Sequence, residues 1–253
     1  MFGTKEFFNY CKKVNGKRKE EGLPEFKPII GCEMYVARHR KTDKVKENGD
    51  MSGYHLIVLA KNYTGYKNLI KLVSRAWVDG YYMRPRTDRE DLETYHEGLI
   101  VCSACIAGEV PRKILRNDME GAREAAQWYH RVFGDDYYLE LQRHEVKDPH
   151  IRANREAFPL QQRANKVMLE LAEEFGIKVV CTNDAHFVDQ ENAEAHDHLL
   201  CLSTGKDLDD PTRMLYSKQE WFKTREEMNE VFGDLPQAMR NTVEILNKVE
   251  TYS

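Results

Sequence analysis

Long apolar runs are missing from this 253-residue sequence, and their absence argues against a membrane-spanning helix. The opening stretch MFGTKEFFNYCKKVNGKRK also lacks the uninterrupted apolar core and the small-residue cleavage site of a secretory signal. Internal repeats and low-complexity segments are missing too, which argues against a solenoid. We therefore expect a cytoplasmic, folded protein with no membrane partner.

An excess of basic residues is missing as well, because 38 Lys and Arg face 42 Asp and Glu, for a net charge of −4. Proteins that bind nucleic acid over a large surface usually carry positive net charge, so any contact with DNA must be local. The cluster of Lys12, Lys13, Lys17, Arg18 and Lys19 is one candidate for such a contact. We favour the simpler interpretation that these charges lie on a solvated helix end and loop.

A second Cys-x-x-Cys pair, which a four-cysteine zinc site would need, is missing from the sequence. The six cysteines of a cytosolic chain should be reduced thiols that either pack in the core or bind a metal. Cys102 and Cys105 have the spacing of a redox motif, but Cys102 lies inside an apolar run rather than at the start of a helix. We therefore expect Cys102 to be packed and a redox function to be absent.

The sequence does contain short β-branched runs that alternate with long amphipathic stretches. This pattern is typical of βα units around a mostly parallel sheet, so it predicts an α/β fold. Buried strands are predicted over residues 27–36, 55–60, 98–103, 137–141 and 178–182. Helices are predicted over residues 119–133, 153–175, 191–204, 226–231 and 236–249, and another begins near Thr64 as its N-cap. The long helix over 153–175 should end at Gly176.

Two features of this pattern set the expected organisation. The segment 38–53 has many charges and little to pack, which predicts a mobile loop. No clear strand follows Asp184, so we expect the sheet-containing domain to cover residues 1–204 and a helical connecting segment to cover residues 205–253.

Candidate functional residues lie where strands are predicted to end, because functional groups collect at the carboxyl ends of parallel strands. Glu33, Cys105 and Glu140 lie in or just past such runs, and Asp184 and His186 follow the last run. Carboxylate, imidazole and thiolate groups together suit Zn²⁺ or Mn²⁺. The Asp-x-His spacing alone is weakly specific, since a lone Asp or His in such a loop is more often a helix cap or a solvent-bonded group.

A second histidine-rich sequence, His196-Asp197-His198, falls on the helix predicted over 191–204. Side chains two residues apart on a helix point in divergent directions and do not chelate well. We therefore interpret this sequence as exposed helix surface.

Several segments occur in the order and spacing of the PHP domain of bacterial DNA polymerase III alpha subunits, the C-family replicative polymerases, and the chain resembles that family. These segments are Met1-Phe2-Gly3, PIIGCEMYVA, YHLIVLAKNYTGYKNLIKLVSRA, EGLIVCSACIAGEVP, TNDAHF and DLDDPTRMLYS. The sequence NTVEI, from Asn241 to Ile245, also resembles the family's link toward the polymerase palm. The resemblance covers essentially the whole chain.

The resemblance implies a metal cluster at the mouth of a distorted (βα)₇ PHP barrel. Glu33 matches the glutamate of the family's Gly-x-Glu motif, and His55 matches its histidine before the next strand. Cys105 matches its cysteine, and Asp184 and His186 match its Asn-Asp-x-His pair. His55 is assigned through the resemblance alone. It comes before its predicted strand, so the rule that functional groups collect at the carboxyl ends of strands (the strand-end rule) does not find it.

The chain departs from the family at its beginning. The family's His-x-His strand and its Thr-Asp-His-Gly segment have no counterpart before Met1. The resemblance therefore implies a PHP barrel without its first strands and first metal-binding motifs, in which the metal need not be retained. The polymerase palm is also absent, so we expect this chain alone to be inactive in nucleotide addition and to have little or no phosphoesterase activity.

For the parent protein the resemblance implies a DNA-directed DNA polymerase, a nucleotidyltransferase of DNA replication. Its partners would be DNA, the remainder of the alpha subunit, a proofreading exonuclease and other replisome subunits. The PHP domain would carry metal-dependent 3′-5′ exonuclease or phosphoesterase chemistry, or would serve as a scaffold for the separate exonuclease. The alternative is a free-standing PHP phosphatase acting on a small phosphate ester, against which the segment from Asp207 onward argues.

Overall fold

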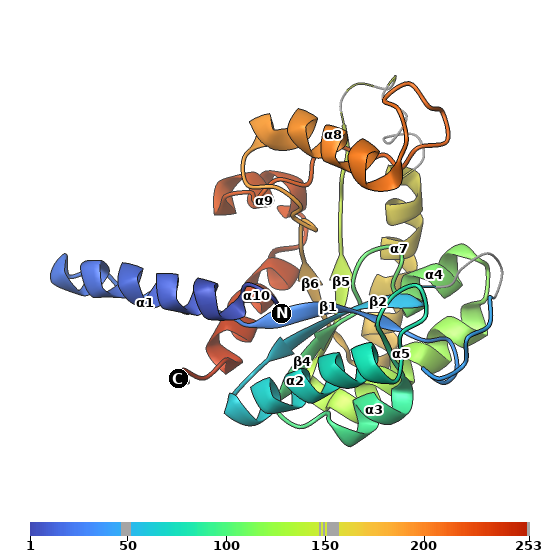
Figure 1. Ribbon diagram of the computed structural model, residues 1–253, viewed down its shortest axis with the longest axis horizontal. Coiled ribbons are helices and arrows are strands. Elements are labelled where there is room, and N and C mark those ends of the chain that lie inside the picture. Colours follow the sequence, from blue (N-terminus) through green and yellow to red (C-terminus); the bar gives the residue numbers. More distant parts are fainter. Residues whose placement is uncertain (47–51, 147, 149, 151–156, 252–253) are drawn as a thin grey trace.

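A six-stranded sheet forms the centre of the computed structural model, which describes residues 1–46, 52–146, 148, 150 and 157–251 (Figure 1). The strands follow the order β3-β1-β2-β4-β5-β6 across the sheet. They are β1 (Gly31–Val36), β2 (Tyr54–Ala60), β3 (Arg86–Thr87), β4 (Leu99–Cys102), β5 (Tyr137–Leu141) and β6 (Lys178–Cys181). The α/β class is confirmed, and a strand lies within each of the five predicted ranges, although the first covers Gly31–Val36 rather than residues 27–36. The two-residue strand β3 was not predicted.

Strand β2 runs against the rest of the sheet. It is antiparallel to both of its neighbours, β1 and β4, whereas β3 is parallel to β1, and β4, β5 and β6 are parallel to one another. The start of β2 therefore lies at the edge where its neighbours have their carboxyl ends. Closure of this sheet into a barrel remains a prediction.

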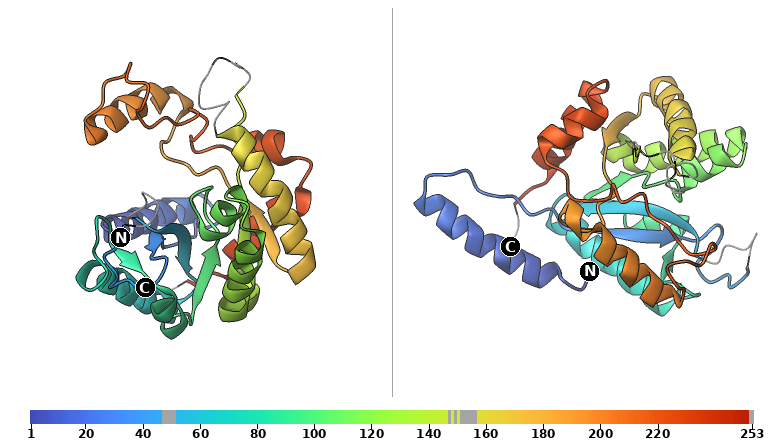
Figure 2. Two further views of the ribbon diagram at one scale, coloured as in Figure 1. Left: turned by 90° about the vertical axis from the view of Figure 1, so that its right-hand side faces the viewer. Right: turned by 90° about the horizontal axis from the view of Figure 1, so that it is seen from above.

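Helices cover the two faces of the sheet unequally. The helices are α1 (Thr4–Glu20), α2 (Tyr63–Val78), α3 (Arg89–Thr94), α4 (Glu109–Leu115), α5 (Met119–Phe133), α7 (Phe158–Phe175), α8 (Ala193–Thr204), α9 (Arg225–Phe232) and α10 (Pro236–Lys248). Alternate strand residues such as Leu56 and Val101 point to one face and share the main core with side chains from α2, α4, α5 and α7. On the other face α10 packs on β6 (Figures 1 and 2). Toward β1 and β2 that second face carries Glu33 and His55, which are not buried.

Most predicted helices are present, with some corrections at their ends. The N-cap of α2 is Asn62 rather than Thr64, because the Asn62 side chain accepts a hydrogen bond from the Gly65 N–H at 3.0 Å. Gly176 ends α7 in a left-handed conformation, as predicted. Helices α3 and α4 were not predicted, and residues 153–156 of one predicted helix lie outside the described residues. None of the helices described is both long and apolar enough to cross a membrane.

The described part of the predicted mobile loop, residues 38–46, is anchored by a buried ion pair. Lys41 is only 3% exposed, and its Nζ lies 3.0 Å from Asp91 Oδ2 and 3.7 Å from Asp88 Oδ2. Arg86 donates hydrogen bonds of 2.9 Å to the backbone carbonyls of Lys41 and Asp43. The premise that this part has little to pack is therefore wrong, since charge pairing replaces the apolar packing that the loop lacks. Residues 47–51 lie outside the described residues.

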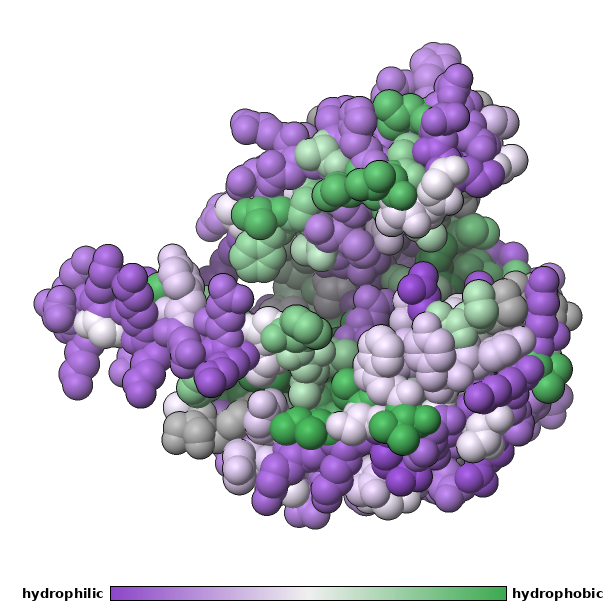
Figure 3. Space-filling view, in the orientation of Figure 1, coloured by the Kyte–Doolittle hydropathy of each residue, from purple (hydrophilic) through white to green (hydrophobic). Residues whose placement is uncertain are grey.

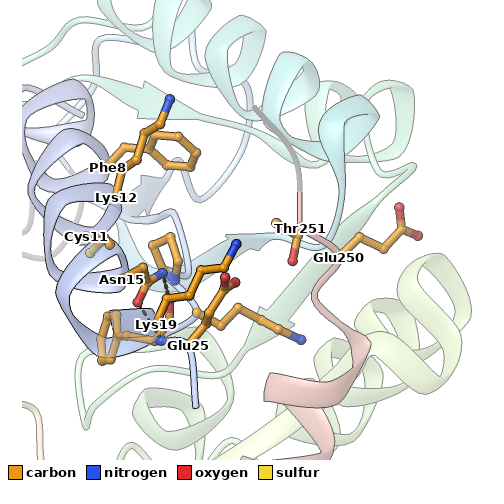
Figure 4. A pocket seen from close by; sticks show the side chains of 12 residues that line it. Phe8, Cys11, Lys12, Asn15, Lys19, Glu25, Glu250 and Thr251 are labelled. Atoms are coloured by element: carbon orange, nitrogen blue, oxygen red, sulfur yellow. Dashed lines mark hydrogen bonds between the residues drawn. The ribbon is translucent and has the colours of Figure 1, made fainter. Parts of the chain in front are cut away.

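Helix α1 projects from the body of the molecule (Figure 1), and its surface in the same view is mostly hydrophilic (Figure 3). Cys11 is its only buried residue. Asn15 ties α1 to the segment that leads to β1, because its side chain makes a pair of 2.7 Å hydrogen bonds with the backbone N–H and carbonyl of Phe26. A cavity of about 410 Å³ lies beside this tie (Figure 4). The basic cluster lies on the carboxyl-terminal half of α1, where cations favour the helix dipole, so the solvated helix end is confirmed.

Candidate metal site

Three different metal-ligating side chains meet at the start of β2. Glu33 of β1, His55 of β2 and Cys105 of the loop after β4 each offer a ligand atom within 4.8 Å of the other two. Glu33 Oε1 lies 2.6 Å from His55 Nδ1, and Cys105 Sγ lies 3.6 Å from the same nitrogen. The three residues converge because β1, β2 and β4 are neighbours and β2 begins where the loop after β4 begins.

A buried carboxylate fixes the loop that carries Cys105 through hydrogen bonds. Glu140 of β5 is 5% exposed, and its Oε2 accepts the Ala104 N–H at 3.1 Å. In turn the Glu140 N–H donates to Ser103 Oγ at 2.8 Å. Burial raises the pKa of Glu140, while hydrogen bonds from Thr182 and Gln142 oppose that shift. Glu140 therefore positions the loop that carries Cys105 and is not one of the three grouped ligands.

Ala104 occupies an unusual backbone conformation in this loop, with φ of 62°. An alanine in the left-handed region costs roughly 1–2 kcal/mol relative to glycine. We expect Ala104→Gly to leave the free energy of unfolding unchanged or to raise it by up to about 1 kcal/mol, as measured by urea denaturation. The matched control is Ala126→Gly in the interior of α5, which should lose about 1 kcal/mol or more. Equal losses for both variants would contradict the proposed strain at Ala104.

Asp184 and His186 border the three-residue group without belonging to it. Both lie in the loop after β6, and Asp184 has a left-handed φ of 48°. His186 Nδ1 lies 2.6 Å from the Asp184 carbonyl, so this nitrogen carries the proton and donates it. The other ring nitrogen, Nε2, then accepts from the Tyr216 hydroxyl at 3.1 Å.

The charges around Cys105 favour a bound cation. Burial raises the pKa of the Cys105 thiol to about 12, and the negative charges of Asp184, Glu33 and Glu140 add to this shift. Burial and the charge of Glu33 raise the pKa of Asp184, against the nearby His186. The hydrogen bond from His55 lowers the pKa of Glu33. Mutually repelling acidic groups around a thiol and an imidazole fit a divalent cation, whose charge would offset the repulsion.

The redox interpretation of Cys102 and Cys105 finds no support in this geometry. Cys102 is buried in β4, and burial raises its pKa well above the ordinary value. A redox-active cysteine needs a populated thiolate, which the raised pKa values of both residues disfavour. Cys102 is packed, as predicted.

The surface interpretation of His196-Asp197-His198 is correct for His198 alone. Asp197 is 7% exposed and pairs with Arg213 through contacts of 2.5 and 2.9 Å. His196 is half-buried, and its ring lies 5.7 Å from that of His186 and 5.1 Å from that of Tyr216. The helix periodicity could not show this, because the segment that covers α8 lies further along the chain. The one available signal for Tyr216 was its place in the DLDDPTRMLYS motif.

Comparison with known sequences identifies the family. The chain belongs to the PHP-domain family, because the family model described as "PHP domain" matches residues 1–144, more than half of its 253 residues. Among curated relatives, it is 41% identical over 253 residues to DNA polymerase III subunit alpha of Borreliella burgdorferi, a match over 100% of this chain and 20% of the relative. It is 38% identical over 259 residues to that of Campylobacter jejuni, covering 98% of this chain and 20% of the relative. It is 37% identical over 252 residues to that of Thermus aquaticus, covering 97% and 19%.

These comparisons confirm the family resemblance of the ordered motifs. The chain spans about a fifth of the length of the relatives it matches.

Proposed function

We propose that this chain forms the PHP-domain part of a bacterial replicative DNA polymerase alpha subunit and acts in DNA replication. Similarity to such subunits along essentially the whole chain supports this proposal over a free-standing phosphatase. The partners would be DNA, the rest of a nucleotidyltransferase subunit, and a proofreading exonuclease with other replisome subunits.

We further propose that Glu33, His55 and Cys105 hold a divalent cation, Zn²⁺ or Mn²⁺, and that Asp184 and His186 complete its surroundings. The observation that carries this proposal is the convergence of the three ligand atoms within 4.8 Å. Thiolate and imidazole ligands favour Zn²⁺, whereas the neighbouring carboxylates also suit Mn²⁺. When bound, such a cation would polarise a phosphoryl oxygen and lower the pKa of a water molecule, which is the chemistry of a phosphoesterase.

The chain's own residues have separate tasks in this proposal. Glu140 and Ser103 fix the loop that presents the Cys105 thiol. The Asp184 carbonyl keeps the proton of His186 on Nδ1, so that Nε2 keeps a lone pair. The Tyr216 hydroxyl donates a hydrogen bond to that lone pair and orients the ring.

Calorimetric titration of the metal-free chain with Zn²⁺ tests the site, and the absorption of bound Co²⁺ reports whether a thiolate is a ligand. We expect Cys105→Ala and Glu33→Gln each to weaken binding at least tenfold, since each removes a ligand. The matched control is Cys201→Ala on α8, a free cysteine outside the group, which should bind as the wild type does.

Equal affinity in Cys105→Ala and Cys201→Ala would contradict the proposed metal site. The phosphoesterase chemistry needs its own assay, namely release of 3′ nucleotides from labelled single-stranded DNA by an alpha subunit that contains this chain, because this chain alone is expected to release little or none. Release that requires Asp184, as judged with Asp184→Asn, would support it, whereas release that does not require Asp184 would contradict it.

A further inference from the structure

A cavity of about 430 Å³ lies between α9 and α10, and the described residues that line it include three cationic side chains and no acidic one. The cations are Lys223, Arg225 and Arg240. Helices α9 and α10 lie one above the other at the side of the sheet where β6 forms the edge (Figure 1). Met228 and Met239 add an apolar wall. This volume is within the range of small-molecule sites, which are typically about 300–1,000 Å³.

The three cations have no ionic partner among the described residues. Arg240 donates only to the neutral Gln237 Oε1, at 3.2 Å from Nε and 2.8 Å from Nη2. Arg225 is exposed at the start of α9 and makes no hydrogen bond or ion pair with a described side chain. Lys223 Nζ donates to the Gln219 carbonyl and lies 3.2 Å from the centre of the Trp221 ring. All three charges are therefore available to an anion.

The surroundings of Lys223 also favour an anion in the cavity. Burial lowers the pKa of Lys223 to about 8, although the nearby Glu220 and Glu227 raise it. A partly desolvated ammonium group without an anion in contact is costly, and an anion in the cavity would offset that cost.

The cavity beside α1 provides a contrast. It is also lined by lysines, Lys12 and Lys19 among them, but Glu25 and Glu250 line it as well (Figure 4). Its charges of both signs give it no preference for an anion. The preference is specific to the cavity between α9 and α10.

We propose that the cavity between α9 and α10 binds the phosphate group of a nucleotide, either free or within a single strand of nucleic acid. Arginine guanidinium groups match the geometry of phosphate oxygens, and Lys223 adds a third positive charge. The methionine wall would face the sugar or the base. The choice of a nucleotide as the phosphate source rests on the proposed role in DNA replication, whereas binding of a phosphate group does not require the metal site.

The test is calorimetric titration of the full chain with dTMP and inorganic phosphate, together with fluorescence anisotropy of labelled dT12. We expect Arg225→Ala and Arg240→Ala each to weaken dTMP binding roughly tenfold, as loss of a charge-assisted hydrogen bond does. If the strand also binds there, each variant should make the slope of log K for dT12 against log salt concentration shallower by about 0.7 per lost phosphate contact. The matched control is Lys166→Ala, an exposed lysine of α7 outside the cavity, which should change affinity less than twofold.

The outcomes separate the possible phosphate sources. Arginine-dependent binding of dTMP without binding of dT12 assigns the site to a free nucleotide, and arginine-dependent binding of both assigns it to the strand. Binding that Lys166→Ala weakens as much as the two arginine variants do, or no binding of any probe, overturns the proposal. The titrations are carried out with a metal chelator present, so failure of the proposed metal site would leave this result unchanged. Both arginines are exposed, and a thermal melt of each variant should match the wild type.

Discussion

Replacement of Gly65 by alanine is expected to lower the free energy of unfolding by about 3 kcal/mol, although alanine is the better helix former. Gly65 lies in the first turn of α2, where the helix backbone packs directly on Gly98. A Cβ atom at Gly65 would lie 1.7 Å from the Gly98 carbonyl oxygen, so a backbone segment must move. The cost of that movement outweighs the gain in helix propensity of about 1 kcal/mol.

Gly16→Ala is the matched control for this prediction. Gly16 also lies inside a helix, α1, but a Cβ atom there would meet no other atom within 4 Å. This variant should therefore gain about 0.5–1 kcal/mol if α1 unfolds together with the rest of the chain, and lose nothing in any case. Urea denaturation followed by circular dichroism measures both variants. A Gly65→Ala variant as stable as Gly16→Ala would show that α2 does not pack on Gly98 as described.

Lys41→Met is expected to lower the free energy of unfolding by about 3 kcal/mol. The change keeps much of the side-chain volume but removes the charge that lies between Asp88 and Asp91. Two buried carboxylates would then face each other with only the partly exposed Arg40 and Arg75 beside them. An unpaired buried charge costs far more than a surface ion pair contributes.

Lys44→Met in the same loop is the control, because Lys44 is exposed and makes no ion pair with a described residue. It should change the free energy of unfolding by less than about 0.5 kcal/mol. Thermal unfolding of both variants at neutral pH measures the difference. If Lys41→Met melted at the wild-type temperature, Arg40 and Arg75 would suffice to balance the two carboxylates.

The periodicity of the sequence predicted where the strands lie but not how they run. Strands such as Tyr137–Leu141 are buried on both faces, so their apolar runs are easily recognised. The direction of β2 is set by its antiparallel pairing with β1 and β4, and no local pattern encodes that pairing. His55 illustrates the consequence, since the strand-end rule fails for a residue at the start of an antiparallel strand. Only the family resemblance led to it.

Buried charges were the second limit of prediction from sequence. Lys41 and Asp197 lie in polar segments, and composition assigns such residues to solvent. Each is buried because its partner comes from another part of the chain, Asp91 for Lys41 and Arg213 for Asp197. Pairings between distant segments leave no periodic signal. In the same way Tyr216 could not be linked to His186 before the fold was known.

The weak attachment of α1 implies that α1 and the sheet open at different free energies. Cys11 is the only buried residue of α1, and among the described residues Asn15 bonds only to Phe26 in the neighbouring segment, whereas strand residues such as Val58 and Ile100 are fully buried. Amide hydrogens of α1 can therefore exchange with solvent through local opening, at a free energy far below that of global unfolding. Amides of β2 and β4 exchange only when the whole sheet opens. A denaturation curve that follows helix content would thus begin with α1 and report the sheet, with the residues gathered at its edge, only later.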